Sequence, residues 1–271
     1  MRIAPGSFTM GSPTSEHGRA PNETAVEARH TLPFYVQTTE VTNAQYRQFK
    51  GNHDSGKLGY HTLDTGDRPA VKVTWDEAAA FCNHLSQQAG LNPVYQQGAN
   101  GMSARQPLPN GYRLPTEAEF EYLLRAGTGA APFPWGGFLP PPARGGNFAD
   151  KTAGPLFGEV MTDYNDGFVA TAPAGSFKAD ANGLHDLAGN AAEWCHDPYT
   201  AVYPSSPSPL VDYTGPPPRA GALRVARGAS FRDHNSRVLR SAYRRTASGA
   251  ADDIGFRVVL PLAGALATSS P

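Results

Sequence analysis

The sequence predicts an α+β domain with little regular structure. It holds 29 glycines and 25 prolines in 271 residues, well above ordinary usage. They follow no period, which excludes a collagen and indicates many fixed turns. Helical and strand patterns occur as scattered short runs and not as alternating βαβ units. Hydrophobic residues make up 39% of the chain, enough for the core of one large domain.

The first fifty residues predict two short strand regions and a helix. Residues 2–12 and 30–41 are rich in β-forming residues and flank a long polar loop. The run TNAQYRQFKG then predicts a helix with its apolar side chains on one face. Thr42 or Asn43 is the expected cap, and Gly51 ends the helix.

A second helix is predicted after a short strand over residues 69–73. Thr74 or Asp76 is its expected cap and Gly90 its end. The residues that place one apolar stripe on this helix are Ala78, Phe81, Cys82 and Leu85. The stripe gives Cys82 a packing role.

A third helix begins at a capping box made by Thr116 and Glu119. Pro115 prevents extension backwards, and Gly127 ends the helix. Its expected core residues are Phe120, Leu123 and Leu124. Glu117, Glu119 and Glu121 occupy the first turns, where carboxylates suit the helix dipole, so their expected role is structural.

The remaining segments are mostly irregular. Residues 92–111 predict a hairpin or a long loop, and 128–222 form a Pro- and Gly-rich stretch that needs a tether such as a metal ion. Residues 223–245 predict a strand, a loop and a short helix or strand. Residues 253–262 predict a terminal strand, so we expect one domain over 1–262, followed by a tail over 263–271.

Charge and hydropathy exclude several classes of function. The net charge of −1 gives no basic face for nucleic acid or an anionic membrane. No apolar run reaches the length of a membrane span, and the N-terminal residues lack the pattern of a signal peptide. The arginines of 237–245 form a local basic cluster, which we interpret as structural hydrogen bonds and ion pairs.

Cys82 and Cys195 are the two cysteines of the chain. Two cysteines do not make a disulfide framework, and no neighbouring pair of them indicates zinc. Pairing requires closeness in space, so the favoured interpretation is two buried free thiols.

Seven stretches in order resemble the formylglycine-generating, sulfatase-modifying-factor-like family. They are PGSFTMGS, TEVTNAQYRQF, PAVKVTWDEAAAFCNHLS, YRLPTEAEFEY, GLHDLAGNAAEW, RVARGASF and IGFRVV. The resemblance covers residues 3–260 and implies an irregular single domain related to the C-type lectin fold, commonly braced by calcium. The founding members are copper-dependent oxidases that convert a sulfatase cysteine to formylglycine.

The resemblance also implies two calcium sites. The first has Asp186, the Gly189 and Ala191 carbonyls, and Glu193 as ligands. The ligands of the second are Asn147, the Phe148 carbonyl, Asp166 and the Phe168 carbonyl. Calcium takes six to eight hard oxygens and tolerates irregular loops, so the chemistry is sensible. The alternative is polar turn chemistry without an ion.

The copper site of the family does not carry over. In the copper oxidases two cysteines follow the R-G-x-S motif and bind the metal as thiolates. Here the segment RGASFRDHNSRVLRSAYRR retains Ser230 but has no cysteine, and Asp233 stands where the first would fall. Ala192 replaces a tryptophan usual beside the oxygen site. Formylglycine formation by the known chemistry is therefore not expected.

A candidate pocket remains around the same motif. Its expected lining is Ser230, Asp233, His234, Asn235, Arg240, Tyr243 and Arg244. Asp233 and His234 form one possible acid–base pair. Non-haem iron held by His234 with His185 or His196 is another possibility without support, because the relatives that use iron take their histidines from a separate helical domain.

Three functions stay open. The first is a calcium-braced module that binds a peptide, a protein or a small molecule. The second is an atypical enzyme that modifies a peptide or secondary metabolite, as a relative in pyoverdine maturation does. The third is a ligand-binding protein diversified by a retroelement. A family bias and the abundance of calcium outside the cytosol favour an exported protein.

Overall fold

The computed structural model describes residues 1–204, 208–217, 219 and 221–262, so the predicted tail lies outside the described residues. Four short helices form within these residues. They are α1 (Asn43–Phe49), α2 (Trp75–Gln88), α3 (Glu117–Leu124) and α4 (Gly154–Phe157). No helix among the described residues has the length and apolarity to cross a membrane.

The strands of the described residues are short and form five small sheets. Two sheets have three strands each: β1 (Arg2–Ile3), β4 (Phe34–Val36) and β14 (Val259–Pro261) in one, and β10 (Leu210–Val211), β3 (Val26–His30) and β2 (Gly6–Met10) in the other. The four-stranded sheet has the order β12 (Arg245–Ala247), β11 (Arg224–Arg227), β9 (Ala192–Pro198) and β13 (Ile254–Gly255). Two hairpins complete the set: β5 (Lys57–Leu58) with β6 (His61–Thr62), and β7 (Tyr95–Gly98) with β8 (Gly101–Ala104).

The three longer helices begin in the same way, and all three were predicted. Each N-cap threonine accepts a hydrogen bond from the third helical residue, whose side chain accepts one from the cap N–H. These reciprocal pairs are Thr42–Gln45, Thr74–Glu77 and Thr116–Glu119. The choice between two caps is thereby decided for Thr42 in α1 and for Thr74 in α2.

The predicted strand over residues 69–73 is wrong. Most of the segment is buried, but Lys72 is exposed and has a φ of +58°, and the N–H groups reach three different partners. Ala70 donates to the Val41 carbonyl, Val71 to the Ser55 hydroxyl and Lys72 to the Ala251 carbonyl. A strand needs one continuous ladder with one neighbour, and this segment has none.

The predicted terminal strand over 253–262 is divided between two sheets. β13 pairs with β9 in parallel, and β14 pairs with β4 in the antiparallel sense. The chain crosses from one sheet to the other between them, so no single strand forms. At the other end of the chain, β3 begins inside the segment expected to be loop, because Val26 pairs with Met10. The predicted hairpin over 92–111 is confirmed as β7 and β8.

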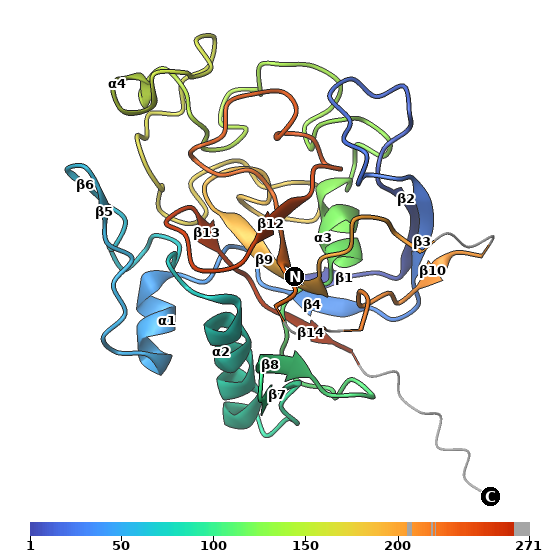
Figure 1. The fold of residues 1–271 in the computed structure, drawn as a ribbon. Coiled ribbons are helices and arrows are strands. Elements are labelled where there is room, and N and C mark those ends of the chain that lie inside the picture. The colour runs from blue at the N-terminus through green and yellow to red at the C-terminus, as the bar shows by residue number, and fades with distance from the viewer. Residues whose placement is uncertain (205–207, 218, 220, 263–271) are drawn as a thin grey trace, which may run out of the picture.

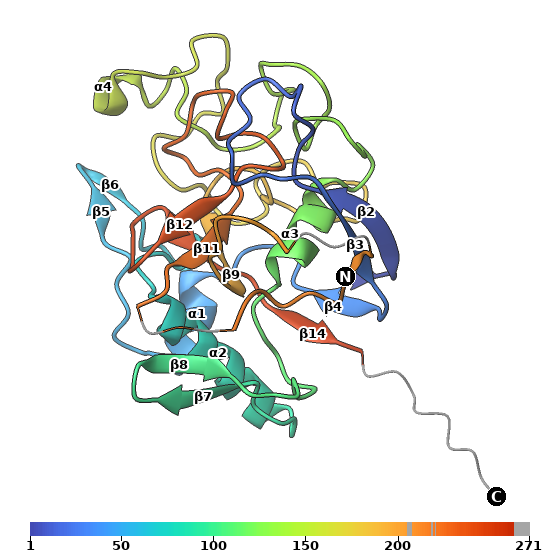
Figure 2. The same ribbon diagram turned by 45° about the vertical axis from the view of Figure 1, so that its right-hand side comes forward.

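The four-stranded sheet lies between two parts of the core. Every residue of β9 is buried. The cluster of Trp75, Phe81 and Trp194 packs on the α2 side, and the cluster of Phe120 and Cys195 packs on the α3 side. Figures 1 and 2 show α1, α2 and the β7–β8 hairpin at one end of the molecule and long loops at the other. Irregular structure therefore dominates the end that carries the predicted sites.

The glutamates of helix α3 form buried ion pairs with arginines from several other segments of the chain. Glu117 pairs with Arg244, Glu119 with Arg113, and Glu121 with both Arg125 and Arg227. All of these side chains are at most 7% exposed. The structural role predicted for the three glutamates is confirmed.

Candidate functional site

The loop after β11 holds Ser230 in a closed arrangement. The backbone turns at Gly228, where φ is +74° and an added Cβ would lie 2.6 Å from the Leu187 carbonyl oxygen. Ser230 is fully buried. Its N–H and its hydroxyl lie 2.8 and 2.9 Å from the same Asp233 oxygen, Oδ2.

A second carboxylate stands on the other side of the Ser230 hydroxyl. Asp253 Oδ2 lies 3.1 Å from the Ser230 Oγ. Arg245 binds both oxygens of Asp253, at 2.7 and 2.9 Å. The serine hydroxyl thus faces two carboxylates and has one proton to donate. This is an oxygen-rich, hydrogen-bonded environment.

The adjacent residues Asp233 and His234 point to different partners. Asp233 turns back to Ser230, whereas His234 Nε2 lies 3.6 Å from Glu159, whose side chain is 90% exposed. The two side chains do not converge as an acid–base pair would. Tyr243 stays near Asp233: burial raises the pKa of its hydroxyl, and the Asp233 charge raises that pKa further.

Arg240 and Arg244 bind buried glutamates of other segments and make no hydrogen bond to Ser230 or Asp233. Arg240 binds both oxygens of Glu23, at 2.6 and 2.7 Å, and one oxygen of Glu16. Arg244 binds both oxygens of Glu117, at 2.6 and 2.8 Å. Both guanidinium groups are buried. The structural interpretation of these two arginines is confirmed, and the structure groups only Ser230, Asp233 and Tyr243 of the expected pocket.

Both cysteines are free and buried, as predicted. Cys82 lies on α2, and Cys195 lies on β9 in a different hydrophobic cluster. Burial raises the pKa of both thiols, so neither is a thiolate at neutral pH. They supply no soft ligand pair for copper beside Ser230.

The two predicted calcium loops meet in the structure. The Asn190 N–H donates to the Asn147 carbonyl at 2.8 Å, and the Asn147 amide donates to Asn190 Oδ1 at 3.0 Å. Gly189 has a φ of +116°, and an added Cβ would lie 2.8 Å from the Asn147 carbonyl oxygen. Only a glycine fits this close approach without displacing the backbone.

Glu193, a predicted calcium ligand, is bound by an arginine. Arg257 donates to both carboxylate oxygens of Glu193, at 2.6 and 2.7 Å, and both side chains are fully buried. Asp186 accepts a hydrogen bond from the Gly175 N–H through Oδ2. The second oxygen of Asp186, Oδ1, is buried without a hydrogen-bond partner among the described residues.

Glu40 completes this cluster, although no motif in the sequence pointed to it. It is fully buried, and its Oε1 accepts from the Asn190 amide at 2.9 Å. Its Oε2 has no partner among the described residues. Burial raises the pKa of Glu40 well above its usual range, and the charges of Asp186 and Glu193 raise it further. Burial also raises the pKa of Asp186 and of Glu193. Three carboxyl groups therefore share one arginine.

The second predicted site is satisfied mainly by backbone amides. Asp166 accepts from the N–H groups of Phe148 and Phe168, each at 2.8 Å. Burial, with a smaller contribution from Asp150 beside it, raises the pKa of Asp166 to about 7. The Asn147 side-chain oxygen is buried without a partner among the described residues. Asp150 is a second acid at this site to which no sequence motif pointed.

A cation fits the first site better than the second. The first holds two buried carboxylate oxygens without a donor among the described residues, Asp186 Oδ1 and Glu40 Oε2, and these two carboxyl groups lie within hydrogen-bonding reach of each other, so either a calcium ion or a shared proton would satisfy them. Within the described residues, no three or more His, Cys, Asp or Glu side chains are arranged to hold a metal ion. A cation at this site would therefore need backbone carbonyls for the rest of its ligands.

The three histidines considered for iron occupy separate places. His185 Nδ1 lies 2.7 Å from the Phe177 carbonyl, and His196 Nδ1 lies 2.9 Å from the Tyr95 hydroxyl. His234 faces Glu159. Their ring partners differ, so the structure gives them no shared site.

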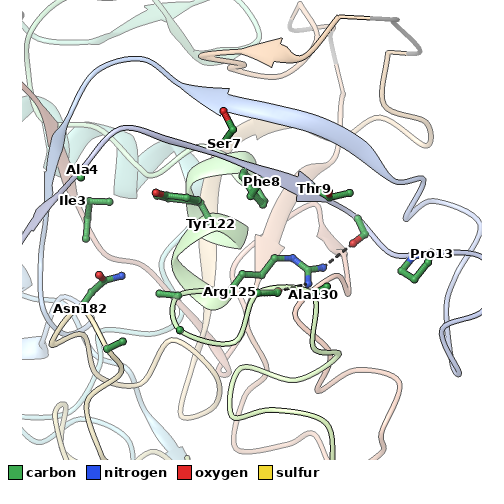
Figure 3. Close-up of a pocket in the computed structure, with 15 residues that line it drawn as sticks. Ile3, Ala4, Ser7, Phe8, Thr9, Pro13, Tyr122, Arg125, Ala130 and Asn182 are labelled. Carbon is green, nitrogen blue, oxygen red and sulfur yellow. Dashed lines mark hydrogen bonds between the residues drawn. The ribbon is translucent and has the colours of Figure 1, made fainter.

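A cavity of about 560 Å³ opens between β2 and the end of α3 (Figure 3). Arg125 is its charged residue, and its donors are already used. It binds Glu121, the Gly11 carbonyl at 2.7 Å and the Gly129 carbonyl at 3.2 Å. The rest of the lining is largely small and apolar, so this cavity presents no free charged group to a ligand.

The chain resembles known proteins in sequence and in structure. Residues 1–262 match the family described as the sulfatase-modifying factor enzyme 1-like domain. The chain is 32% identical to a formylglycine-generating enzyme of Streptomyces coelicolor, over 95% of this chain and 87% of the relative. It is 28% identical to an inactive C-alpha-formylglycine-generating enzyme 2 of Mus musculus, over 93% and 82% of the two chains. The structure of PvdO from Pseudomonas aeruginosa superposes with a TM-score of 0.70 and 27% identity, covering 96% of this chain and 93% of PvdO.

Proposed function

The chain belongs to the family of sulfatase-modifying factor enzyme 1-like domains, and within it we propose a member without the copper oxidase site. Its proposed role is that of a calcium-braced module that binds a peptide, a protein or a small molecule. The name of the mouse relative supports a family member of this kind, since that protein is called inactive.

The observation that carries the proposal is the closure of the Ser230 loop by Asp233. Copper(I) favours soft thiolate ligands, whereas the groups around Ser230 are carboxylate oxygens. The two thiols of the chain are buried in two hydrophobic clusters with raised pKa values. The donor set does not fit copper, so no oxidation step follows from these residues.

Calcium is part of the proposal because of the buried charge around Arg257. One guanidinium group faces the carboxyl groups of Glu193, Asp186 and Glu40. Since Arg257 already holds Glu193, Asp186 and Glu40 are the acids with an oxygen left for an ion. The Gly189 and Ala191 carbonyls of the same loop would supply further hard ligands. A bound ion would tie the long irregular loops to the four-stranded sheet.

A turnover assay tests the missing oxidase activity. The substrate is a peptide that carries a sulfatase cysteine, supplied with Cu(I) and oxygen, and the Streptomyces coelicolor relative serves as the positive control. We expect the control to convert cysteine to formylglycine and this chain to leave the peptide mass and thiol unchanged. Copper-dependent conversion by this chain would overturn the proposal.

A further inference from the structure

A second cavity, of about 580 Å³, is lined by no residue of the Ser230 loop. It is bounded by the β7–β8 hairpin, the end of β9, the start of β11 and the loop over 214–217. Trp75, Pro216 and Pro217 give it apolar walls. None of the residues in the two predicted calcium sites lines it. We call it the Arg224 cavity.

Arg224 brings a positive charge to this cavity. Its guanidinium carbon lies 3.3 Å from the centre of the Trp75 ring, a cation–π contact that fixes the plane of the group. Its Nη2 donates to the Met102 carbonyl at 3.1 Å. Nε and Nη1 have no hydrogen-bond partner among the described residues, and no described carboxylate forms an ion pair with Arg224. Arg240 and Arg244, by contrast, are each bound to a glutamate.

His196 adds a neutral donor to the same cavity. The Tyr95 hydroxyl accepts from the Leu114 N–H at 3.1 Å, so its own proton is free to go to His196 Nδ1, 2.9 Å away. Burial lowers the pKa of His196 to about 3, so the ring is neutral at physiological pH. A neutral ring that accepts at Nδ1 carries its proton on Nε2. No described residue accepts that proton.

The surroundings favour a negative ligand. The other polar side chains of the lining are uncharged: Gln96, Ser103, Gln106 and Thr214. No aspartate or glutamate among the described residues lines the cavity. Two acids lie nearby. Asp76 Oδ2 accepts from the Met102 N–H, and Asp197 Oδ2 accepts from the Glu117 N–H inside the fold, where burial raises the pKa of Asp197 well above its usual range.

We propose that the Arg224 cavity binds a carboxylate group. The Arg224 guanidinium supplies the charge and an N–H donor from Nε or Nη1, and the His196 Nε2–H supplies a second donor. Trp75 and the two prolines receive the apolar part of the ligand. The volume suits a small organic acid or the last residues of a peptide, which present the same carboxylate chemistry.

This inference deepens the proposed binding role and rests on it for its biological meaning. It uses no residue of the Ser230 loop. The turnover assay above and the titrations below therefore fail independently of each other.

The experiment is a binding titration on the full chain with matched probes. Benzoate is compared with benzamide, and an N-acetylated tripeptide ending in phenylalanine is compared with its C-terminal amide. Binding is followed by ligand-observed NMR up to about 10 mM, the range of weak single-group recognition. We expect each carboxylate to bind at least about tenfold more tightly than its neutral amide, a difference of one charged hydrogen-bonding group.

Two neighbouring residues of β7 give a matched pair of variants. Gln96 lines the cavity and Gln97 does not, and both are exposed. Gln96→Glu should weaken carboxylate binding about fivefold through like-charge repulsion, whereas Gln97→Glu should leave it unchanged. Arg224→Gln should remove it. The Gln96 pair keeps the test decisive if Arg224→Gln fails to fold.

The outcomes separate the sources of the ligand. If benzoate binds more tightly than the tripeptide acid, the ligand is a small organic acid. If the tripeptide acid binds more tightly than benzoate, the ligand is a peptide terminus. Equal affinity for acids and amides, equal effects of the Gln96 and Gln97 variants, or no saturable binding of either acid would overturn the proposal.

Discussion

Replacing Arg240 with methionine should strongly destabilise the protein, although the Ser230 region does not use this arginine. Arg240 makes four hydrogen bonds: two to Glu23, one to Glu16 and one to the Gly18 carbonyl. The side chains of Arg240 and Glu23 are 1% and 0% exposed. Removing the arginine leaves a buried carboxylate without its counter-charge.

The expected loss follows from that burial. Removing one partner of a buried ion pair costs about 3–5 kcal/mol of the free energy of unfolding. For a domain of this size the same loss lowers the melting temperature by roughly 10 °C or more. Neutralising Glu23 as well should recover part of the loss. In Arg240→Met/Glu23→Gln we expect at least about 1 kcal/mol less destabilisation than the sum of the single variants.

Urea unfolding followed by fluorescence measures these differences. Arg237→Met is the matched control, because Arg237 lies in the same loop, is exposed and forms no ion pair with a described residue. It should change the free energy of unfolding by less than about 0.5 kcal/mol. A loss below about 1 kcal/mol for Arg240→Met, or strict additivity in the double variant, would contradict the reasoning.

Three further perturbations test the predicted sites. Chelation of calcium should lower the melting temperature of the wild type and leave that of Asp186→Ala unchanged. Glu193→Gln should have a lower melting temperature than the wild type with or without calcium, because it weakens the Arg257–Glu193 ion pair. A wild-type melting temperature that does not change with chelator would argue against calcium. The pKa of His196 is about 3 in the folded protein, below its unfolded value. At acid pH the ring therefore takes up a proton when the protein unfolds, which favours the unfolded state. Relative to His196→Gln, the free energy of unfolding of the wild type should fall by about 1.4 kcal/mol per pH unit as the pH falls from 6.5 towards 3. Parallel pH profiles of the free energy of unfolding for the two proteins would contradict this. Gly189→Ala should cost more than about 2 kcal/mol in urea unfolding because of the contact with Asn147, while Gly137→Ala, with open space around it, should be neutral; equal stabilities would count against the close approach.

The sequence predicted the local elements well because local chemistry determines them. The capping boxes at Thr74 and Thr116 lie within four residues of sequence and fix where the helices begin. The segment over 69–73 does not form the predicted strand, because its apolar pattern shows neither the left-handed φ of Lys72 nor the three separate partners of its N–H groups.

The sites were harder to predict because their partners lie far apart in the chain. Glu40 meets Asn190 across 150 positions, and Arg240 meets Glu23 across 217. Arg240 and Arg244, which were expected in the pocket, are each paired with a buried glutamate that lies far away in the sequence. The Arg224 cavity joins residues from four distant segments, and no motif announced it.

The division of the C-terminal segment between two sheets bears on how the chain reaches its native state during synthesis. β4 emerges early from the ribosome, yet both of its neighbours, β1 and β14, are needed for its sheet, and β14 is made more than two hundred residues later. The glutamates of α3 likewise wait for Arg227 and Arg244. Long-range pairing of this kind is slow and leaves apolar edges exposed meanwhile. A nascent chain that ends before β11 should therefore remain protease-sensitive, and holding chaperones should bind it until the last strand is released.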